Sequence, residues 1–466
     1  MGLSAAMEIG KNGLKIYQVA NEVTAENIAN VNTPGYSRQR VILENAPPTT
    51  ANGFPLGTGV KISTVERYYD GLLQQQLVTA GSTSGYDTTK SQVLQQIEPT
   101  FNELTQDGLG SAITKFFGAW QDLSTNPAGT TERQAVLSRA QVLADNFHSI
   151  STTLNNSIAT QDAALTPLAA DINNTLSNIA TLNGQIKQTE LVSGNANEMR
   201  DQRDLLVRQL SENMGIKYTE NADGTTDVYV QNGATNNYLV QGTQFGSLSL
   251  SGSSPATAVT INDVAGASVA VDPLAATPLY TAPDGGQLWA TLQMRDVTIP
   301  GYLDQVNTLA ASIISQVNTQ HQAGVDPSGI AGLPFFTGTL GSEAATIAVN
   351  SAISSSPDKI AAADLAASAP GGNKNALAIA QLQSGFNTSY NNLVAQIGLD
   401  VQQAKTVQSQ DEAFTKQLNT LRDSKSGVSL DEELTNMVMY QRSYQASAKL
   451  ITTATEMMDT VIGMIR

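Results

Sequence analysis

Residues 143–186 read LADNFHSISTTLNNSIATQDAALTPLAADINNTLSNIATLNGQI, and this stretch decides the class of fold. Its apolar residues recur at steps of mostly three and four, which is the period of an amphipathic helix. An unbroken helix of this length would extend about 65 Å, so a rod-shaped domain is predicted. Pro167 has no amide hydrogen and is expected to kink or interrupt the helix. The apolar stripe consists of Leu143, Phe147, Ile150, Leu154, Ile158, Leu165, Leu168, Ile172, Leu176, Ile179, Leu182 and Ile186.

The same period appears in two segments far along the chain, residues 288–317 and 379–404. None of the three segments could bury its stripe alone, so we expect one bundle assembled from distant parts of the sequence. The predicted fold class is multidomain and mainly α, a coiled-coil-like rod of long helices from the N- and C-terminal parts with an inserted β-rich domain. The helical rod is expected to comprise residues 51–215, 285–324 and 373–425.

The texture of the sequence changes between the first two helical blocks. Residues 231–283 hold only two charged residues, Asp263 and Asp272, amid Gly, Ser, Thr and Val. Short β-prone runs separated by Asn-Gly, Gly-Ser and Asn-Asp turns predict strands, and we expect a β-rich outer domain at residues 216–284. A second insertion, residues 325–372, has an irregular Gly-, Pro- and Ala-rich texture. It either belongs to the outer domain or packs on the rod.

A separate helix is predicted at the C-terminal end of the chain. Ser426-Gly427-Val428 should break the preceding helix, and Ser429 with Glu432 fits a capping box, with Ser at the N-cap and Glu at N3. Apolar residues then recur at an interval of seven, as in a seam that packs against a partner helix. Half of the ten Met residues lie in the final 30 residues of the sequence, which gives a soft and adaptable surface. The repeat consists of Leu430, Met437, Tyr444, Ile451, Met458 and Ile465, supported by Leu434, Ala448, Ala454, Val461 and Ile462.

The N-terminal end carries a matching helix. Ile9, Ile16 and Val23 share the interval of seven, and Ile28 lies near the same face. This helix must end before Pro34, and Asn30 and Asn32 can cap or end it. Thr33-Pro34-Gly35-Tyr36 has Pro and Gly at the positions that a type II turn requires, after which the chain becomes extended.

We expect the two ends, residues 1–50 and 426–466, to pair with each other as a terminal domain. In the isolated subunit they are expected to be largely disordered, because isolated helices are marginally stable in water. The alternative is an ordinary amphipathic tail helix that docks on the core of its own chain.

Composition excludes several classes of function. The chain has 25 Lys and Arg against 41 Asp and Glu, a formal net charge of −16, which argues against nucleic acid as a partner and against binding to an anionic membrane surface. No apolar run is long enough to insert into a membrane, and no cleavable signal peptide is recognised. Only 14% of residues are charged, which suits either a surface that packs against copies of itself or a general compositional habit.

The sequence offers no convincing catalytic, cofactor-binding or metal-binding residues, and an enzyme is not predicted. His148 and His321 have no triad or metal-ligand neighbours in sequence, so each is expected to be structural or solvated. Asp431-Glu432-Glu433 could suggest a carboxylate site, but its place in a first helical turn is explained by capping and by the helix dipole.

Both ends also carry motifs of a known superfamily. Residues 27–40, NIANVNTPGYSRQR, resemble the N-terminal motif of the axial proteins of the bacterial flagellum, and residues 429–462 resemble their paired C-terminal motif. Two internal segments, residues 196–206 (ANEMRDQRDLL) and 299–306 (IPGYLDQV), narrow the resemblance to the hook-associated protein 1 family.

This resemblance implies a structural subunit at the junction between hook and filament. The terminal residues named above would then form the polymerisation interface. The implied partners are copies of the same chain, the hook protein, a second junction protein (hook-associated protein 3) and an export chaperone that binds the C-terminal helix. The implied location is the flagellum, reached by type III export without signal cleavage. Two alternatives remain open, namely a hook or distal-rod subunit, and a surface adhesin carried on the inserted β domain.

Overall fold

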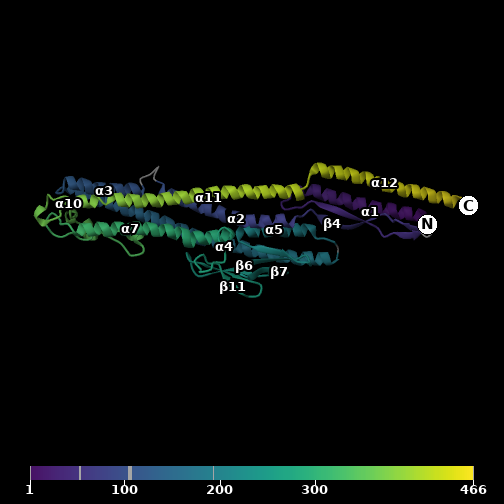
Figure 1. Ribbon diagram of the computed structural model, residues 1–466, viewed down its shortest axis with the longest axis horizontal. Coiled ribbons are helices and arrows are strands. Elements are labelled where there is room, and N and C mark those ends of the chain that lie inside the picture. Colours follow the sequence, from purple (N-terminus) through teal and green to yellow (C-terminus); the bar gives the residue numbers. More distant parts are fainter. Residues whose placement is uncertain (1, 52–53, 103–107, 193, 465–466) are drawn as a thin grey trace.

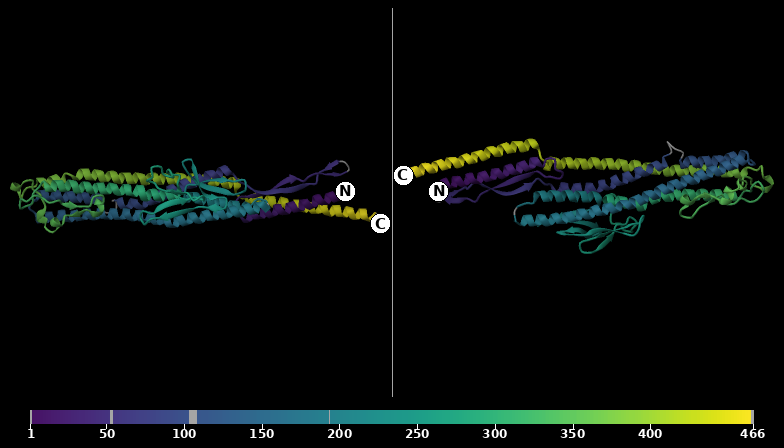
Figure 2. Two further views of the ribbon diagram at one scale, coloured as in Figure 1. Left: turned by 90° about the horizontal axis from the view of Figure 1, so that it is seen from below. Right: turned by 180° about the vertical axis from the view of Figure 1, so that it is seen from behind.

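The computed structural model describes residues 2–51, 54–102, 108–192 and 194–464 of a long, narrow molecule (Figure 1). Both chain ends lie at one pole of the molecule, and a small β-rich unit projects from the flank of the rod (Figure 2). The predicted class, mainly α with an inserted β region, is confirmed. The predicted interface residue Ile465 lies outside the described residues. None of the described helices has the length and the hydropathy that crossing a membrane requires.

The longest helix of the rod is α4 (Thr130–Val192), which contains the stripe on which the fold prediction rests. The helix continues through Pro167 without a break, so the expected interruption at this residue is wrong. One lost backbone hydrogen bond is a small cost beside the packing on both sides, because Leu165 and Leu168 are buried.

Helices from distant parts of the chain complete the bundle around α4, as the shared period predicted. Residues from α2, α3, α4, α7 and α11 share one apolar core. Aromatic rings fill the distal end of this core, which is the end away from the two chain termini. Phe116, Phe117, Trp120 and Phe147 are fully buried there. The remaining rod elements are α2 (Gly71–Ile97), η1 (Glu98–Phe101), α3 (Leu109–Thr125), α5 (Asn197–Asn213), α6 (Gly286–Gln293), the π-helix η2 (Met294–Thr298), α7 (Ile299–Gln322), α10 (Lys374–Ala380) and α11 (Gln383–Ser426).

The irregular segment 325–372 packs on the distal end of the rod and not on the β domain. Phe335 and Phe336 enter the aromatic core beside Phe116, and the buried Arg133 of α4 donates to the carbonyl of Ile360 at 2.6 Å. These contacts favour the second of the two placements left open by the sequence. The short elements of the segment are β12 (Phe336–Thr337), α8 (Glu343–Thr346), β13 (Ala348–Val349), α9 (Ser351–Ser354), η3 (Pro357–Lys359) and η4 (Ala366–Ser368).

His321 holds this segment in place. Its Nδ1–H donates to the carbonyl of Leu333 at 2.6 Å, and its Nε2 accepts from the amide of Ala361 at 2.9 Å. The ring also packs edge-on against Trp120 and Phe335. Burial lowers the pKa of the imidazole to about 4, so the ring is neutral and serves a structural purpose.

The inserted β unit consists of two small antiparallel sheets seated on α4. Val228, Leu239 and Ile261 share a core with Leu168 and Ile172 of α4. The first sheet has the order β5-β6-β7-β8 and the second has the order β11-β10-β9. The strands are β5 (Lys217–Glu220), β6 (Thr226–Asn232), β7 (Thr235–Gln241), β8 (Gln244–Phe245), β9 (Ser247–Ser251), β10 (Ala258–Asn262) and β11 (Ser268–Ala270).

A buried ionic contact fixes this unit to the rod. Asp162 of α4 accepts from the amide of Thr257 at 3.0 Å and from Nη1 of Arg295 at 2.6 Å. The same guanidinium donates to the carbonyl of Thr257 at 2.7 Å. The carboxylate and the guanidinium therefore bind both polar groups of one backbone residue, which holds the loop of the β unit against the helices.

The close approach of α2 to α5 depends on Gly85. A Cβ atom built on this residue would lie 2.1 Å from the carbonyl oxygen of Glu212, which is backbone and cannot move aside. We expect Gly85→Ala to lower the free energy of unfolding by about 1–3 kcal/mol, measured by urea denaturation. Gly118 of α3 is a matched control, because no atom lies within 4 Å of its Cβ position, and Gly118→Ala should be neutral or stabilising by up to about 1 kcal/mol. Equal stability of the two variants would contradict this packing.

Candidate functional site

The two terminal helices, α1 (Gly2–Ala29) and α12 (Leu430–Gly463), lie side by side in antiparallel directions (Figure 1). Tyr17 of α1 stacks on Tyr440 of α12 with a ring-centroid distance of 6.4 Å. Nearer the chain end, a Cβ atom built on Gly10 would lie 2.6 Å from Cγ1 of Ile451. The expected pairing of the ends is therefore present within one subunit, and the small Gly10 permits the close approach.

The residues of α12 that face α1 include Ala454, which the sequence analysis named, and Glu433, Tyr440 and Ser447, which it did not select. Glu433, Tyr440, Ser447 and Ala454 follow at an interval of seven, three residues after members of the predicted repeat. Glu433 and Ala454 are the buried residues of α12, and Ser447 lies against Gly13 of α1. The two series together form the alternating three-and-four spacing of a two-helix seam.

The predicted residues divide between this seam and the surface. On α1, Ile16 and Val23 are buried, Ile28 is half-buried, and Ile9 is 37% exposed beside Gly59. On α12, the predicted residues Met437, Ile451 and Met458 are half-buried, whereas Leu430, Leu434, Tyr444 and Val461 are exposed.

A second apolar stripe runs along α12 beside the seam, and one member, Leu450, also reaches α1, since its Cδ2 lies 3.1 Å from a Cβ atom built on Gly10. Its members are separated by 11, 7, 4 and 3 residues, which places them on one face of the helix. Within the described chain this face is left at the surface, with exposed fractions from 42% to 82%. We call it the outer stripe, and it consists of Met439, Leu450, Met457, Val461 and Met464.

The turn after α1 opens a polar joint between the helix pair and the rod. The amide of Tyr36 donates to the carbonyl of Thr33 at 3.2 Å, and Gly35 has φ +84°, as the predicted type II turn requires. Pro34 occupies the first central position of this turn. Asn30 accepts from the hydroxyl of Thr33 at 3.0 Å at the end of α1, and Asn32 is exposed.

The fully buried Asn27 is the centre of this joint. Its Oδ1 accepts from the amide of Gln39 and from the hydroxyl of Tyr36, both at 2.9 Å. Its Nδ2 donates to the carbonyl of Gln39 at 2.9 Å and to Oε2 of Glu433 at 3.1 Å. One amide side chain therefore ties α1 to the strand after the turn and to the start of α12.

The start of α12 is held by an arginine and not by a capping box. Ser429 is at the N-cap as predicted, but its side chain makes no capping hydrogen bond. Glu432 instead binds Nη1 of Arg38 at 2.5 Å, and Glu433 binds Nε of Arg38 at 2.6 Å. The predicted capping box is wrong because charge-assisted bonds to the guanidinium are stronger than bonds to a neutral amide.

A two-stranded ribbon leads from the turn back to the rod. It is formed by β1 (Gln39–Asn45) and β4 (Val60–Arg67) in antiparallel pairing, and it is extended by β2 (Thr49–Ala51) and β3 (Phe54–Leu56). The ribbon lies beside α1 and crosses the boundary at residue 50 that was expected between the terminal and rod domains.

Two aspartates of α5 anchor the ribbon to the rod. Asp201 accepts from the amide of Ser37 and from Nη1 of Arg67, both at 2.7 Å, and Nη1 of Arg67 also lies 2.8 Å from Asp204. Burial raises the pKa of Asp201 in spite of the opposing effect of Arg67. Burial also acts against the charge of Arg67, but Asp204 and Asp201 outweigh it and raise the pKa of the guanidinium.

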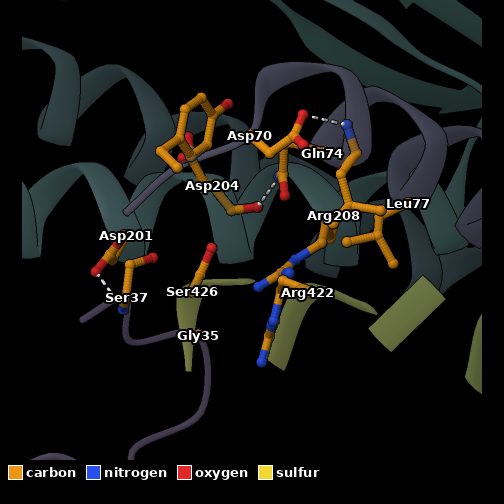
Figure 3. Close-up of a pocket in the computed structure, with 12 residues that line it drawn as sticks. Gly35, Ser37, Asp70, Gln74, Leu77, Asp201, Asp204, Arg208, Arg422 and Ser426 are labelled. Atoms are coloured by element: carbon orange, nitrogen blue, oxygen red, sulfur yellow. Dashed lines mark hydrogen bonds between the residues drawn. The ribbon is translucent and has the colours of Figure 1, made fainter. Parts of the chain in front are cut away.

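Figure 3 shows the small cavity at the joint, with Ser37 and Asp201 on one side and Arg208 and Arg422 on the other. Gln74 of α2 donates to the carbonyl of Asp204 at 3.0 Å, and the amide of Arg38 donates to the carbonyl of Ser426 at 2.8 Å. The joint therefore collects the segment after α1, the ribbon, α2, α5 and the end of α11 at one place. In the described residues, no cluster of three or more potential metal ligands is present.

Comparisons with known proteins first define the class of both chain ends. Residues 7–36 match the family model described as flagella basal body rod protein, and residues 422–464 match the C-terminal model of the flagellar basal body rod FlgEFG proteins. The paired terminal helices with their joint are therefore those of a flagellar axial protein. Residues 94–336 match the model described as flagellar hook-associated protein FlgK helical domain.

Similarity over the whole chain defines the family. Flagellar hook-associated protein 1 of Bacillus subtilis (strain 168) is 30% identical over 98% of this chain and 97% of its own length. The protein of that name from Escherichia coli (strain K12) is 25% identical over 99% of this chain and 100% of its own length. The chain belongs to the flagellar hook-associated protein 1 (FlgK) family, which confirms the resemblance found in the motifs.

A solved structure of the flagellar hook junction protein FlgK from Burkholderia pseudomallei is 28% identical in sequence. It aligns with a TM-score of 0.49 over 57% of this chain and 47% of that chain.

Proposed function

We propose that this chain is a structural subunit of the junction between the flagellar hook and filament, and that it polymerises through α1 and α12. The observation that carries the proposal is the outer stripe of α12, an apolar helix face at the surface of a chain that belongs to this family. Soluble single-chain proteins rarely leave such a face uncovered, and a neighbouring copy would bury it.

The energetics favour coupled folding and association. Glu433 and Ala454 are the buried residues of α12, so within one subunit this helix leaves most of its apolar surface partly or fully exposed. Burying a Leu, Met or Val side chain contributes about 1.5–3 kcal/mol, so the outer stripe could supply on the order of 10 kcal/mol per subunit before ordering entropy is subtracted. Neighbours would therefore stabilise the terminal helices at the moment of assembly.

The partners follow from this role. We propose that copies of this chain contact one another, and that the hook protein lies on one side of the layer and the second junction protein, hook-associated protein 3, on the other. An export chaperone that covers α12 before assembly would shield the same apolar face. The chain would then leave the cell through the flagellar type III apparatus without cleavage of a signal.

Electron microscopy of a strain without the gene tests the proposal. We expect hooks without filaments, with filament protein lost to the medium, and restoration by the full chain but not by residues 1–429. Antibody labelling of the complemented strain should mark the hook–filament junction alone. Filaments of normal number on the deletion strain would contradict a junction role, and labelling along the whole hook would favour the alternative of a hook subunit.

A further inference from the structure

The seam between α2 and α11 contains acidic residues where apolar residues are usual. The inward positions of both helices alternate at steps of three and four, the pattern of a two-helix coiled coil. Asp87 and Asp411 occupy such positions. The α2 series is Leu73, Leu77, Ala80, Ser84, Asp87, Ser91 and Leu94, and the α11 series is Ile397, Val401, Ala404, Gln408, Asp411, Thr415 and Leu418.

The antiparallel register of the two helices brings these carboxyls together. Leu418 clusters with Leu77 and Ala80, one heptad to one side of the pair. The carboxyls of Asp87 and Asp411 lie within hydrogen-bonding reach of each other. Moving seven residues back along α2, from Asp87 to Ala80, therefore corresponds to moving seven residues forward along α11, from Asp411 to Leu418.

Neither carboxyl is neutralised by a close cation. Asp87 is 6% exposed, and Oδ2 of Asp411 is buried and has no hydrogen-bond donor from the protein. Within the described part of the chain, no salt bridge joins either residue to Lys, Arg or His. Two ionised carboxylates in contact at such a site would repel strongly, whereas one proton shared between them makes a hydrogen bond.

We propose that protonated Asp87 donates a hydrogen bond to Asp411 in the α2–α11 seam, that this contact fixes the register of the two helices, and that loss of the proton loosens the seam. A polar pair at a core position is a known means of setting register at a cost in stability. Here the stability cost of the polar pair depends on pH, so the packing of α2 against α11 is sensitive to protonation. We call the Asp87–Asp411 pair the latch.

The protonation of Asp87 is governed mainly by its burial and by its contact with Asp411. Burial is the largest effect and the contact with Asp411 is the next, and together they raise the pKa of Asp87 to about 7, which Lys90 opposes. Glu212 of α5 lies beside Gly85, and burial raises its pKa as well. Glu412 follows Asp411 on α11 and accepts a hydrogen bond from Gln408, whereas α6 (Gly286–Gln293) carries no titratable residue.

The sign of the pH effect follows from linkage. An unfolded Asp has a pKa of about 3.9, so between that pH and about 7 the folded chain binds one more proton than the unfolded chain. The stability of the seam therefore falls as the pH rises through this window, and the full penalty is present above pH 7. Asp411→Asn keeps a permanent hydrogen-bond donor next to Asp87 and should remove the penalty.

Amide hydrogen exchange of the full chain tests the latch, with variant and wild type compared at the same pH so that intrinsic rates cancel. At pH 8.5 we expect amides of residues 80–91 and 404–415 to exchange about tenfold more slowly in Asp411→Asn than in wild type. At pH 5.5 the exchange rates of these amides should agree within about twofold between the two proteins. The same ratio at both pH values, or faster exchange in the variant at both, would overturn the proposal.

Two further variants separate the latch from other titrations. Glu26 of α1 is paired with Glu198 of α5, and the contact with Glu198 raises the pKa of Glu26 to about 7. Glu198→Gln should leave exchange in the α2–α11 seam unchanged at both pH values, and a change there would mean that the pH response comes from the terminal joint. The double variant Asp87→Leu with Asp411→Leu should protect the seam without dependence on pH, and a retained pH response would count against the pair.

Discussion

Met457→Glu should abolish junction assembly without unfolding the subunit. Met457 is 55% exposed on the outer stripe, so a carboxylate there stays solvated in the isolated chain. At an interface between copies the same charge would lose its water without gaining a partner, which costs several kcal/mol. We expect cells that make this variant to carry hooks with at least tenfold fewer filaments, counted by electron microscopy, while circular dichroism of the purified subunit remains unchanged.

Matched substitutions on the same helix separate the two faces of α12. Thr452→Glu introduces the same charge at an exposed position away from both the seam and the outer stripe, and it should leave filaments and motility normal. Ile451→Asp places a carboxylate against Gly10 in the seam, so it should loosen the α1–α12 pair in the subunit and also abolish assembly. Normal filament numbers with Met457→Glu would show that the outer stripe does not contact another molecule.

Arg67→Met should lower the free energy of unfolding by about 3–5 kcal/mol, because it removes the cation from a buried ion pair and leaves two carboxylates behind. Asp201 and Asp204 lie 2.7 and 2.8 Å from the guanidinium, and all three side chains are at most 12% exposed. The loss should shrink as the pH is lowered towards 4, because burial raises the pKa of Asp201 and protonation of this carboxyl removes its repulsion of Asp204. Urea denaturation at pH 7.5 and pH 4.5 measures both effects.

The same ribbon offers a control at the surface. Lys61 and Glu44 form an ion pair at 2.6 Å, but both side chains are about half exposed, so Lys61→Met should cost at most about 1 kcal/mol. Adding Asp201→Asn and Asp204→Asn to Arg67→Met should recover part of the lost stability. If Arg67→Met were no more harmful than Lys61→Met, the joint would not depend on its buried charges.

Periodicity was sufficient to predict the helices but selected only half of the terminal seam. Large apolar residues such as Ile451 stand out, whereas Tyr440 and Ser447 do not, because a small or polar residue can face a helix that approaches closely at Gly10 or Gly13. The sequence feature that could have identified Tyr440 and Ser447 is the interval of seven that they share with Glu433 and Ala454. Pro167 was overestimated as a helix breaker because local propensity yields to the packing of a long buried stripe.

The contacts of the joint could not be predicted from local sequence patterns. Ser37 and Asp201 are separated by 164 residues, and Arg67 and Asp201 by 134, so no periodicity relates them. The family resemblance marked the segments around residues 27–40 and 196–206 as meaningful, but their meeting depends on the path of the whole chain. The prediction of a capping box was wrong because it considered only neighbouring residues. The group that binds Glu432 is Arg38, which lies 394 residues earlier in the chain.

The antiparallel pairing of α1 with α12 also acts as a test of chain integrity. The hydrogen bond from Asn27 to Glu433 closes a loop of 406 residues, so α1 can meet α12 only after the chain between them has been synthesised. A fragment that ends before residue 430 would keep α1 but lack α12. In such a fragment Asn27 and Arg38 would both lose their contacts with Glu433.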